Sequence, residues 1–374
     1  MRRTALGVGV LLAASVAGVS SWRARPVRGA TATWNEAAAA NYLDGREIWW
    51  QQWPHAQRDH GTICVSCHTQ LPYAMVRPAL QRQMSEAGVP PAEKIMLDTV
   101  ETRVNHWPEM VPFYSDEKSG AGKTAESHAT EAILNAIILI SYDTQQGHLR
   151  PVTRTALDAA WALQQKTGEL AGGWLWQNFH LAPFESDESG YQGAALFLVE
   201  AENAPDRYAS EPEVRQHLEQ LQAFLQRGYA KQPVMNQLYI LWASGKVHGL
   251  LSKEERNALL EEVRGLQQAD GGWRLAAMDK SPRLDDSTQS TESDGYATGL
   301  TVLALEESGT KPGDAALRRG VAWLESHQEA AGNWPATSLN KERDPKTDIG
   351  KFMSDAATGY AVLALQEARS TPNP

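Results

Sequence analysis

The stretch LQQADGGW at residues 266–273 decides the fold, because the chain repeats it. Residues 327–334 read HQEAAGNW and keep the Gln, the Gly and the Trp at the same spacing. A looser copy, LQQKTGELAGGW, occupies residues 163–174, and the apolar run VLAL at 302–305 returns at 362–365. Self-similarity over a period of this length is typical of arrays of one supersecondary unit.

Each copy of the turn joins a charged amphipathic helix to a nearly apolar helix rich in Gly and Ala. Charged helices with one apolar stripe belong outside, whereas apolar helices with small residues pack closely inside. No segment alternates like a strand. The sequence therefore predicts an all-α fold, an α/α toroid of about five helical hairpins preceded by a short helical c-type haem segment whose helices can close the ring. The expected outer helices are 92–107, 153–165, 211–228, 253–268 and 313–328, and the inner ones 126–142, 188–202, 232–243, 294–307 and 355–367.

The repeat at residues 319–334 resembles the QW repeat of squalene-hopene and oxidosqualene cyclases. This resemblance covers roughly residues 90–374 and implies the α/α toroid of the terpenoid cyclase and protein prenyltransferase superfamily. Class II cyclases protonate a polyene with an Asp-x-Asp-Asp motif, and here Asp294 keeps the first acid but Tyr296 stands at the proton-donor position. A phenol is a far weaker acid than an activated carboxyl. We therefore do not expect class II cyclase activity.

A second signature, Cys-x-x-Cys-His, contains both cysteines of the chain, Cys64 and Cys67, followed by His68. The pattern predicts one covalent haem c, in which two thiols bind vinyl groups and His68 is the proximal iron ligand. A reducible cysteine pair is the alternative, but it needs a βαβ setting that the surrounding sequence does not provide. Met110 is the candidate distal ligand. The alternatives are an open site, Met75, Met84, His106 and His128.

The N-terminus has Arg2 and Arg3 before an apolar run over residues 5–19, the pattern of a signal peptide. It predicts a periplasmic or otherwise exported protein, with the segment either cleaved or kept as a membrane anchor. The expected parts are a signal peptide at 1–20, the haem segment at 30–88 and the toroid at 89–374. A formal net charge of −10 argues against nucleic-acid partners.

Acids stand at the expected starts of the inner helices, and aromatic side chains lie in the loops before them. One interpretation is helix capping. The other is a pocket where the helix starts meet at one mouth of the toroid, with an apolar or sugar-like ligand. The residues expected to line it are Trp174, Trp176, His180, Asp187, Asp294, Tyr296 and Asp355.

Two functions follow from these features. The first is an exported monohaem c-type cytochrome-like protein that takes part in electron transfer or haem-linked redox chemistry with a redox partner protein. Its toroid would serve as a ligand-binding or docking module. The alternative is an enzyme acting in the toroid cavity, either isoprenoid cyclase-like or saccharide-active, with an accessory haem. The sequence names no catalytic residue for either function.

Overall fold

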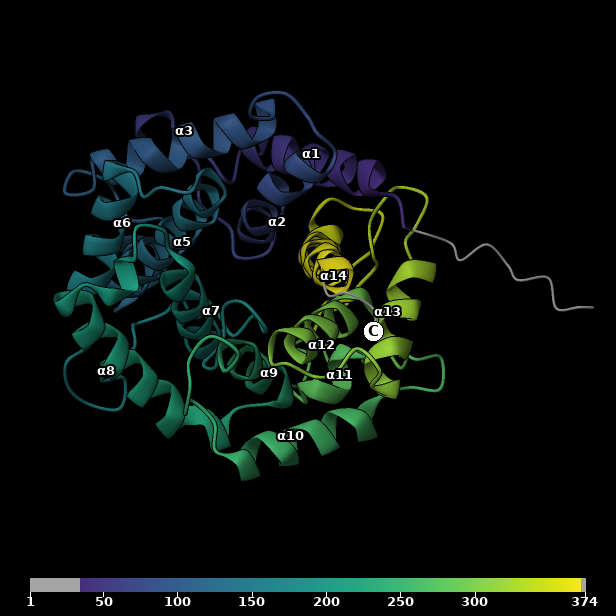
Figure 1. The fold of residues 1–374 in the computed structure, drawn as a ribbon. Helices are drawn as coiled ribbons and strands as arrows, with labels where there is room; N and C mark the ends of the chain where they lie inside the picture. The colour runs from purple at the N-terminus through teal and green to yellow at the C-terminus, as the bar shows by residue number, and fades with distance from the viewer. Residues whose placement is uncertain (1–33, 371–374) are drawn as a thin grey trace, which may run out of the picture. The chain divides into compact units, whose positions relative to one another are not determined.

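The computed structural model describes residues 34–370 of the chain, so the predicted signal segment at 1–20 lies outside the described residues. Every named element in this range is a helix, and no β-strand occurs within it. The prediction of an all-α toroid is confirmed. The twelve longer helices form six hairpins, each with one outer and one inner member, arranged as two concentric rings (Figure 1).

The outer ring consists of α1 (Glu36–Gln52), α3 (Pro91–Asn105), α6 (Pro151–Ala162), α8 (Pro212–Gly228), α10 (Lys253–Leu266) and α13 (Ala315–Ser326). The inner ring consists of α2 (Gln70–Gln83), α5 (Lys123–Gln146), α7 (Ser189–Asn203), α9 (Val234–Ala243), α12 (Gly295–Glu307) and α14 (Phe352–Ser370). Short helices α4 (Asp116–Ser119) and α11 (Leu275–Met278) lie in the loops, with 3₁₀ turns at Asp59–Gly61, Tyr208–Ser210, Tyr229–Lys231 and Ile349–Lys351.

The two rings differ because their helices differ in sequence. On α8 the buried residues follow a helical stripe that includes Val214, Leu218, Leu221 and Leu225, and the opposite face is polar. On α12 nearly every residue is buried, and Gly299 approaches α14 so closely that a Cβ atom would lie 2.7 Å from the Ala361 backbone nitrogen. Small residues therefore let the inner helices pack side by side.

The repeated Gln of each turn holds the next outer helix. Gln164 donates from Nε2 to the carbonyl oxygens of Gly172 (2.9 Å) and His217 (3.1 Å). Gln267 makes the same pair of hydrogen bonds to Gly271 (2.8 Å) and Ala316 (2.9 Å). One amide thus ties its own turn to the outer helix of the following hairpin, which explains why the motif recurs.

The last turn of the series closes the ring on the first hairpin. Gln328 donates to the carbonyl oxygens of Gly332 (2.9 Å) and Asn35 (3.0 Å), so the start of α1 takes the place of a following outer helix. Gly332 has φ +98°, and a Cβ atom there would lie 2.1 Å from the carbonyl oxygen of Ala38. In the inner ring α14 packs on α2. The segment that carries the Cys-x-x-Cys-His motif is therefore one hairpin of the toroid.

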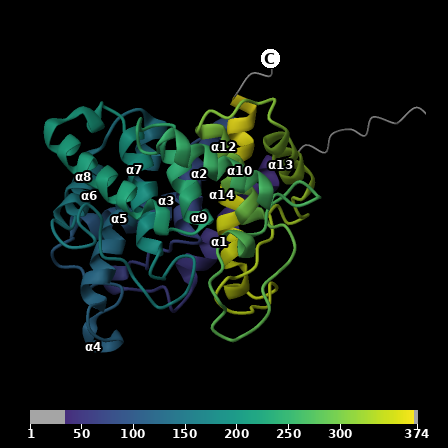
Figure 2. The same ribbon diagram turned by 90° about the horizontal axis from the view of Figure 1, so that it is seen from below.

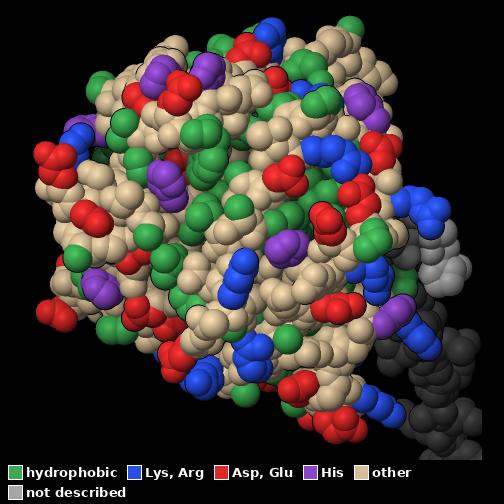
Figure 3. Space-filling view, turned by 90° about the vertical axis from the view of Figure 1, so that its left-hand side faces the viewer, with side chains coloured by type: hydrophobic (Ala, Val, Ile, Leu, Met, Phe, Trp, Pro, Cys, Tyr) green, Lys and Arg blue, Asp and Glu red, His purple; other side chains and the backbone are tan. Residues whose placement is uncertain are grey.

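The inner helices begin at one end of the ring, which we call the mouth. The long loops before α12 and α14 lie at this end together with α4 (Figure 2). On the face seen in Figure 3, acidic and basic side chains are interspersed and form no broad patch of one sign. Among the described residues no helix is both long and apolar enough to cross a membrane.

Candidate functional site

A groove of about 600 Å³ lies at the mouth, between the loop that follows Trp174 and the end of α8. We call it the mouth groove. It contains carboxylates, amides, aromatic rings and cations, which is the mixture that a polar ligand requires. Its lining includes Glu126, Trp174, Trp176, Asn178, Asp187, Tyr191, Arg227, Lys231 and Gln232.

Two carboxylates of the mouth groove are held by one residue, Asn178. Its backbone N–H donates to Glu126 Oε2 (3.2 Å), in the first turn of α5. Its side-chain Nδ2 donates to Asp187 Oδ1 (2.5 Å), just before α7. Lys123 Nζ lies 2.7 Å from the same Glu126 oxygen and adds a positive charge. Acids from two successive inner helices are thereby fixed on either side of one amide.

The floor of the mouth groove is aromatic. The indole N–H of Trp176 donates to the Phe184 carbonyl oxygen (2.9 Å), which fixes the ring. A Cβ atom at Gly193 of α7 would lie 2.3 Å from that ring, so the missing side chain makes room for it. Trp176 is partly exposed and lines the mouth groove.

Cations form the opposite rim of the groove. Arg227, at the end of α8, donates to the Ala171 carbonyl oxygen, and Lys231 follows one helical turn later. Both side chains are exposed. Within residues 34–370 neither lies within 4 Å of a carboxylate, so both charges are available to an anionic group on a ligand.

A second hollow of about 180 Å³ surrounds the Cys-x-x-Cys-His motif, and we call it the motif cavity. Trp50 of α1 holds the motif through a hydrogen bond from its indole N–H to the Cys64 carbonyl oxygen (2.8 Å). Burial raises the pKa of the Cys64 thiol to about 12 and raises that of Cys67 as well. Both are free thiols. The cavity is lined by Trp50, Trp53, Cys64, Val65, Ser66, Cys67, His68, Phe113, Tyr114, Ser127, Thr130, Gln177, Phe184, Glu185 and Phe352.

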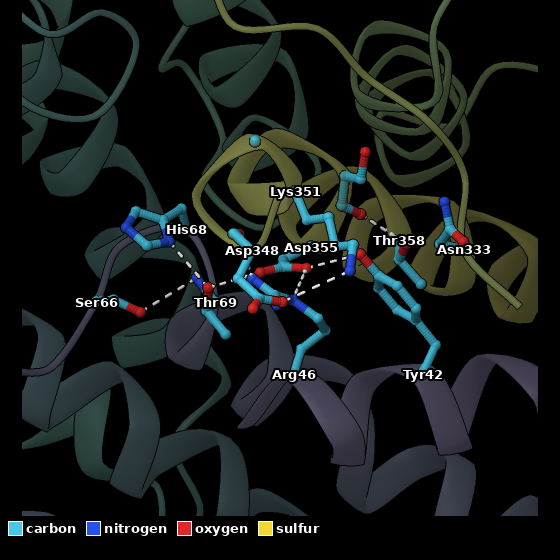
Figure 4. Close-up of polar contacts among 12 residues, drawn as sticks. Tyr42, Arg46, Ser66, His68, Thr69, Asn333, Asp348, Lys351, Asp355 and Thr358 are labelled. Carbon is cyan, nitrogen blue, oxygen red and sulfur yellow. Dashed lines mark hydrogen bonds and ion pairs between the residues drawn. The ribbon is translucent and has the colours of Figure 1, made fainter. Parts of the chain in front are cut away.

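A chain of hydrogen bonds fixes the His68 imidazole (Figure 4). Thr69 Oγ1 donates to Asp355 Oδ2 (2.8 Å) and therefore accepts from His68 Nδ1 (2.9 Å), which must carry the ring proton. Arg46 Nε and the Tyr42 hydroxyl each donate to Asp355 Oδ1 at 2.8 Å. Burial lowers the pKa of His68 to about 3, so the ring is neutral with its lone pair on Nε2.

The structure separates the residues expected to form one pocket. Trp174, Trp176 and Asp187 line the mouth groove, whereas His180 is exposed in the same loop. Asp294 is the N-cap of α12 and accepts hydrogen bonds from the Ala297 (2.9 Å) and Leu275 (2.6 Å) backbone N–H groups. Tyr296 and Asp355 are buried elsewhere.

Tyr296 lies inside the ring, in a cluster of phenols. Its hydroxyl and that of Tyr360 both lie 2.7 Å from the Tyr239 hydroxyl, and Gln192 Nε2 is 2.8 Å from the Tyr239 hydroxyl. Burial raises the pKa of Tyr296 well above its ordinary value. These phenols fill the centre of the inner ring as neutral, mutually bonded groups.

Two features of the sites were missed in the sequence. Asn178, which joins the two acids, and Gln177 and Glu185, which line the motif cavity, all lie in the polar loop before α7. Their position in a loop at the mouth was the available signal, but it did not show which side chains turn inward. Met110, the candidate distal ligand, is buried but is not among the residues lining the motif cavity.

Comparison with known proteins supports the fold. The family model of the squalene-hopene cyclase C-terminal domain matches residues 236–371. No curated protein matches the sequence. Unsaturated glucuronyl hydrolase from Bacillus sp. GL1, responsible for the degradation of glycosaminoglycan, superimposes with a TM-score of 0.52 at 12% identity, over 88% of this chain and 94% of that chain. A glycosidase in complex with glucose gives a TM-score of 0.47 at 11% identity, over 90% of this chain and 98% of that one.

These comparisons correct the first predicted function. A single toroid fold extends over 88% of the chain, and α1 and α2, on either side of the Cys-x-x-Cys-His motif, form one of its hairpins within the described residues. The prediction of a cytochrome-like electron-transfer protein with a toroid as docking module is therefore wrong. The chain is similar to the squalene-hopene cyclase family in its C-terminal part and to these toroids over nearly its whole length.

Proposed function

We propose that this chain is a saccharide-active toroid that binds an oligosaccharide in the mouth groove and cleaves a glycosidic bond there. The observation that carries the proposal is the pair of carboxylates, Glu126 and Asp187, held by the backbone and side chain of Asn178. Most glycoside hydrolases use two carboxyl groups, one as the acid that protonates the leaving oxygen and one as base or nucleophile.

The rest of the groove suits a sugar. A volume of about 600 Å³ falls within the range of small-ligand sites. Trp176 offers a flat surface to the face of a sugar ring, while Asn178 and Gln232 offer amides to its hydroxyl groups. Arg227 and Lys231 on the far rim favour a sugar that carries a carboxylate. The similarity to unsaturated glucuronyl hydrolase is a reason to test uronic acids first.

The experiment is a turnover assay with purified protein on a panel of neutral, uronic and unsaturated uronic oligosaccharides. We expect cleavage of at least one acidic member of the panel. Glu126→Gln and Asp187→Asn should each lower kcat by about 100-fold or more while the circular dichroism spectrum is retained, because each removes one proton-transfer group. Glu213→Gln, an exposed acid on the outer face of α8, is the matched control and should keep full activity.

Two results would overturn the proposal. One is that folded wild-type protein neither binds nor cleaves any member of the panel. The other is that cleavage persists undiminished in the Glu126→Gln and Asp187→Asn variants, which would place the chemistry outside the mouth groove.

A further inference from the structure

The motif cavity contains polar groups that the protein leaves without partners. The Gln177 side chain is 3% exposed, and both its amide nitrogen and its amide oxygen lack a hydrogen-bond partner. Glu185 lines the same cavity, and its carboxyl group receives no hydrogen bond from any described residue. A buried amide left unsatisfied costs about 1–3 kcal/mol. Such groups in a cavity indicate that a ligand supplies the missing partners.

The walls of the cavity indicate a large, flat and mainly apolar ligand. Aromatic rings surround it on several sides, and the Phe352 ring stacks on the His68 imidazole with centroids 3.8 Å apart. The cavity is also lined by both thiols, which are the only cysteines of the chain. The aromatic walls are Trp50, Trp53, Phe113, Tyr114, Phe184 and Phe352.

The His68 ring is oriented as metal-binding imidazoles commonly are. Metal-ligating histidines donate their second N–H to a fixed acceptor, which sets the tautomer and directs the other nitrogen to the metal. Here Thr69, the N-cap residue of α2, is the acceptor, and Asp355 of the neighbouring helix α14 fixes Thr69 in turn. The remaining nitrogen, Nε2, has no hydrogen-bond partner in the described part of the chain. The side chains present therefore fit a haem in their donor chemistry.

We propose that the motif cavity holds one haem, bound covalently through Cys64 and Cys67, with His68 Nε2 as its only protein ligand to iron. Each thiol adds across one vinyl group: a carbon–sulfur bond forms, and the thiol hydrogen goes to the other vinyl carbon. Nothing is released and no oxidant or reductant is consumed. The proposal concerns a cofactor site inside a toroid and goes beyond the proposed saccharide activity.

The single protein ligand follows from the cavity lining. It includes no methionine and no imidazole other than His68, and Met110 lies outside it. Among the polar side chains that line it, Gln177, Glu185 and three hydroxyl residues are not usual haem ligands. Tyr114 belongs to a class that ligates haem iron as the phenolate, but burial raises the pKa of its phenol and keeps it neutral. We therefore expect a coordination position that is open to small exogenous ligands.

Binding requires the rim of the cavity to move. A volume of about 180 Å³ is below the range that holds drug-sized ligands, and a porphyrin exceeds it. Of the aromatic walls only Trp50 is fully buried, so the partly exposed rings, among them Phe352 and Trp53, are the ones that can turn aside. Rotamer changes of this kind are common when ligands and partners bind.

The test is to produce the whole chain in cells with an active c-type haem attachment system, beside a c-type cytochrome that shows the system works. We expect the denatured chain to have gained the mass of one haem, with a pyridine haemochrome spectrum typical of two thioether bonds. The ferric protein should lack the long-wavelength band of methionine ligation, and the ferrous protein should bind carbon monoxide with a full shift of its Soret band.

Matched variants separate attachment from ligation. Cys64→Ala combined with Cys67→Ala should lose all covalent haem while keeping its helical spectrum. Thr69→Val should keep both thioether bonds but lose the single orientation of His68, seen as a mixture of spin states.

Wild-type chain that folds and remains unmodified beside a loaded control cytochrome would overturn the proposal. A methionine band, or ferrous protein that does not bind carbon monoxide, would overturn the open position. Saccharide cleavage is measured in a separate assay from haem attachment, so the failure of one proposal does not obscure the outcome of the other.

Discussion

The first hairpin and the last hairpin occupy equivalent places in the ring but are connected differently. The helices α13 and α14 are joined by the Gln-Gly-Trp turn, in which the Trp334 indole donates to the Leu324 carbonyl oxygen (2.8 Å). The helices α1 and α2 are joined instead by a connection that carries Trp53 and the Cys-x-x-Cys-His motif. The difference teaches that the repeated Gln-Gly-Trp residues close the ring. The connection between α1 and α2, which lacks them, is free to carry the residues of a binding site.

The use of buried polar groups shows the same contrast. In the last repeats Asp294 accepts two backbone N–H groups and Gln328 bridges two chain segments. Single side-chain atoms of Arg274, Glu306 and Thr310 lack a partner there. At the mouth beside the first hairpin, Gln177 has an amide with no partner. Gln177 differs in that both polar atoms of its amide lack a partner and the side chain lines a cavity, which indicates where a ligand binds.

The largest effect should come from breaking the contact between these two hairpins. Gly332→Ala places a Cβ atom 2.1 Å from the Ala38 carbonyl oxygen of α1, at φ +98°. Neither backbone can move without opening the ring, so we expect a loss of about 3–5 kcal/mol in unfolding free energy. Urea denaturation followed by circular dichroism measures it.

Gly147→Ala is the control for that substitution. Gly147 ends α5 with φ +77°, but a Cβ atom there would meet nothing within 4 Å. Only the cost of a left-handed alanine remains, about 1 kcal/mol. Equal losses for the two variants would show that α1 does not pack against the last turn.

A smaller effect should follow from removing the amide that bridges the hairpins. Gln328→Ala deletes two hydrogen bonds to backbone carbonyls and one accepted from the Asn35 backbone N–H (2.6 Å). Gln267→Ala deletes the equivalent pair within the regular repeats and one accepted from Arg319. At about 1 kcal/mol for each bond we expect a loss of about 2–3 kcal/mol for either variant. If only Gln267→Ala destabilises the protein, the first hairpin is not joined to the ring as the others are.

The sequence predicted the rings because Gln, Gly and Trp must recur wherever one turn packs on the next outer helix. It also placed Trp176 and Asp187 at the mouth, since both lie in a loop before an inner helix. It could not predict that Asp355 orients His68 through Thr69, because residues so distant in the chain meet only when α14 packs on α2. Spacing also did not reveal which buried groups lack partners, since that depends on every neighbour in three dimensions.

The smallest effect concerns Asp294, the first acid of the cyclase-like motif. Burial raises its pKa to about 6, although hydrogen bonds from backbone N–H groups partly offset this. Because the folded state then binds a proton more tightly than the unfolded state, Asp294 makes stability fall as the pH rises from about 4 to about 6. Asp294→Asn keeps a capping oxygen without the titration.

The amide keeps only one of the two acceptor oxygens, so Asp294→Asn should cost about 1–2 kcal/mol at pH 4 and less at pH 7, and the pH dependence between these values should flatten. Asp314→Asn is the control of opposite sign. Asp314 caps α13 and is also buried in part, but hydrogen bonds from the Leu317 backbone and Arg264 lower its pKa, so its contribution is lost as the pH falls. Denaturation midpoints measured from pH 4 to pH 7 would distinguish the two.

Because the charge on Asp294 is used to cap α12 and Tyr296 is a buried neutral phenol, neither variant should affect any catalytic step. If squalene cyclisation is observed and disappears in a folded Asp294→Asn protein, the groove at the mouth is not the only site of chemistry in this ring.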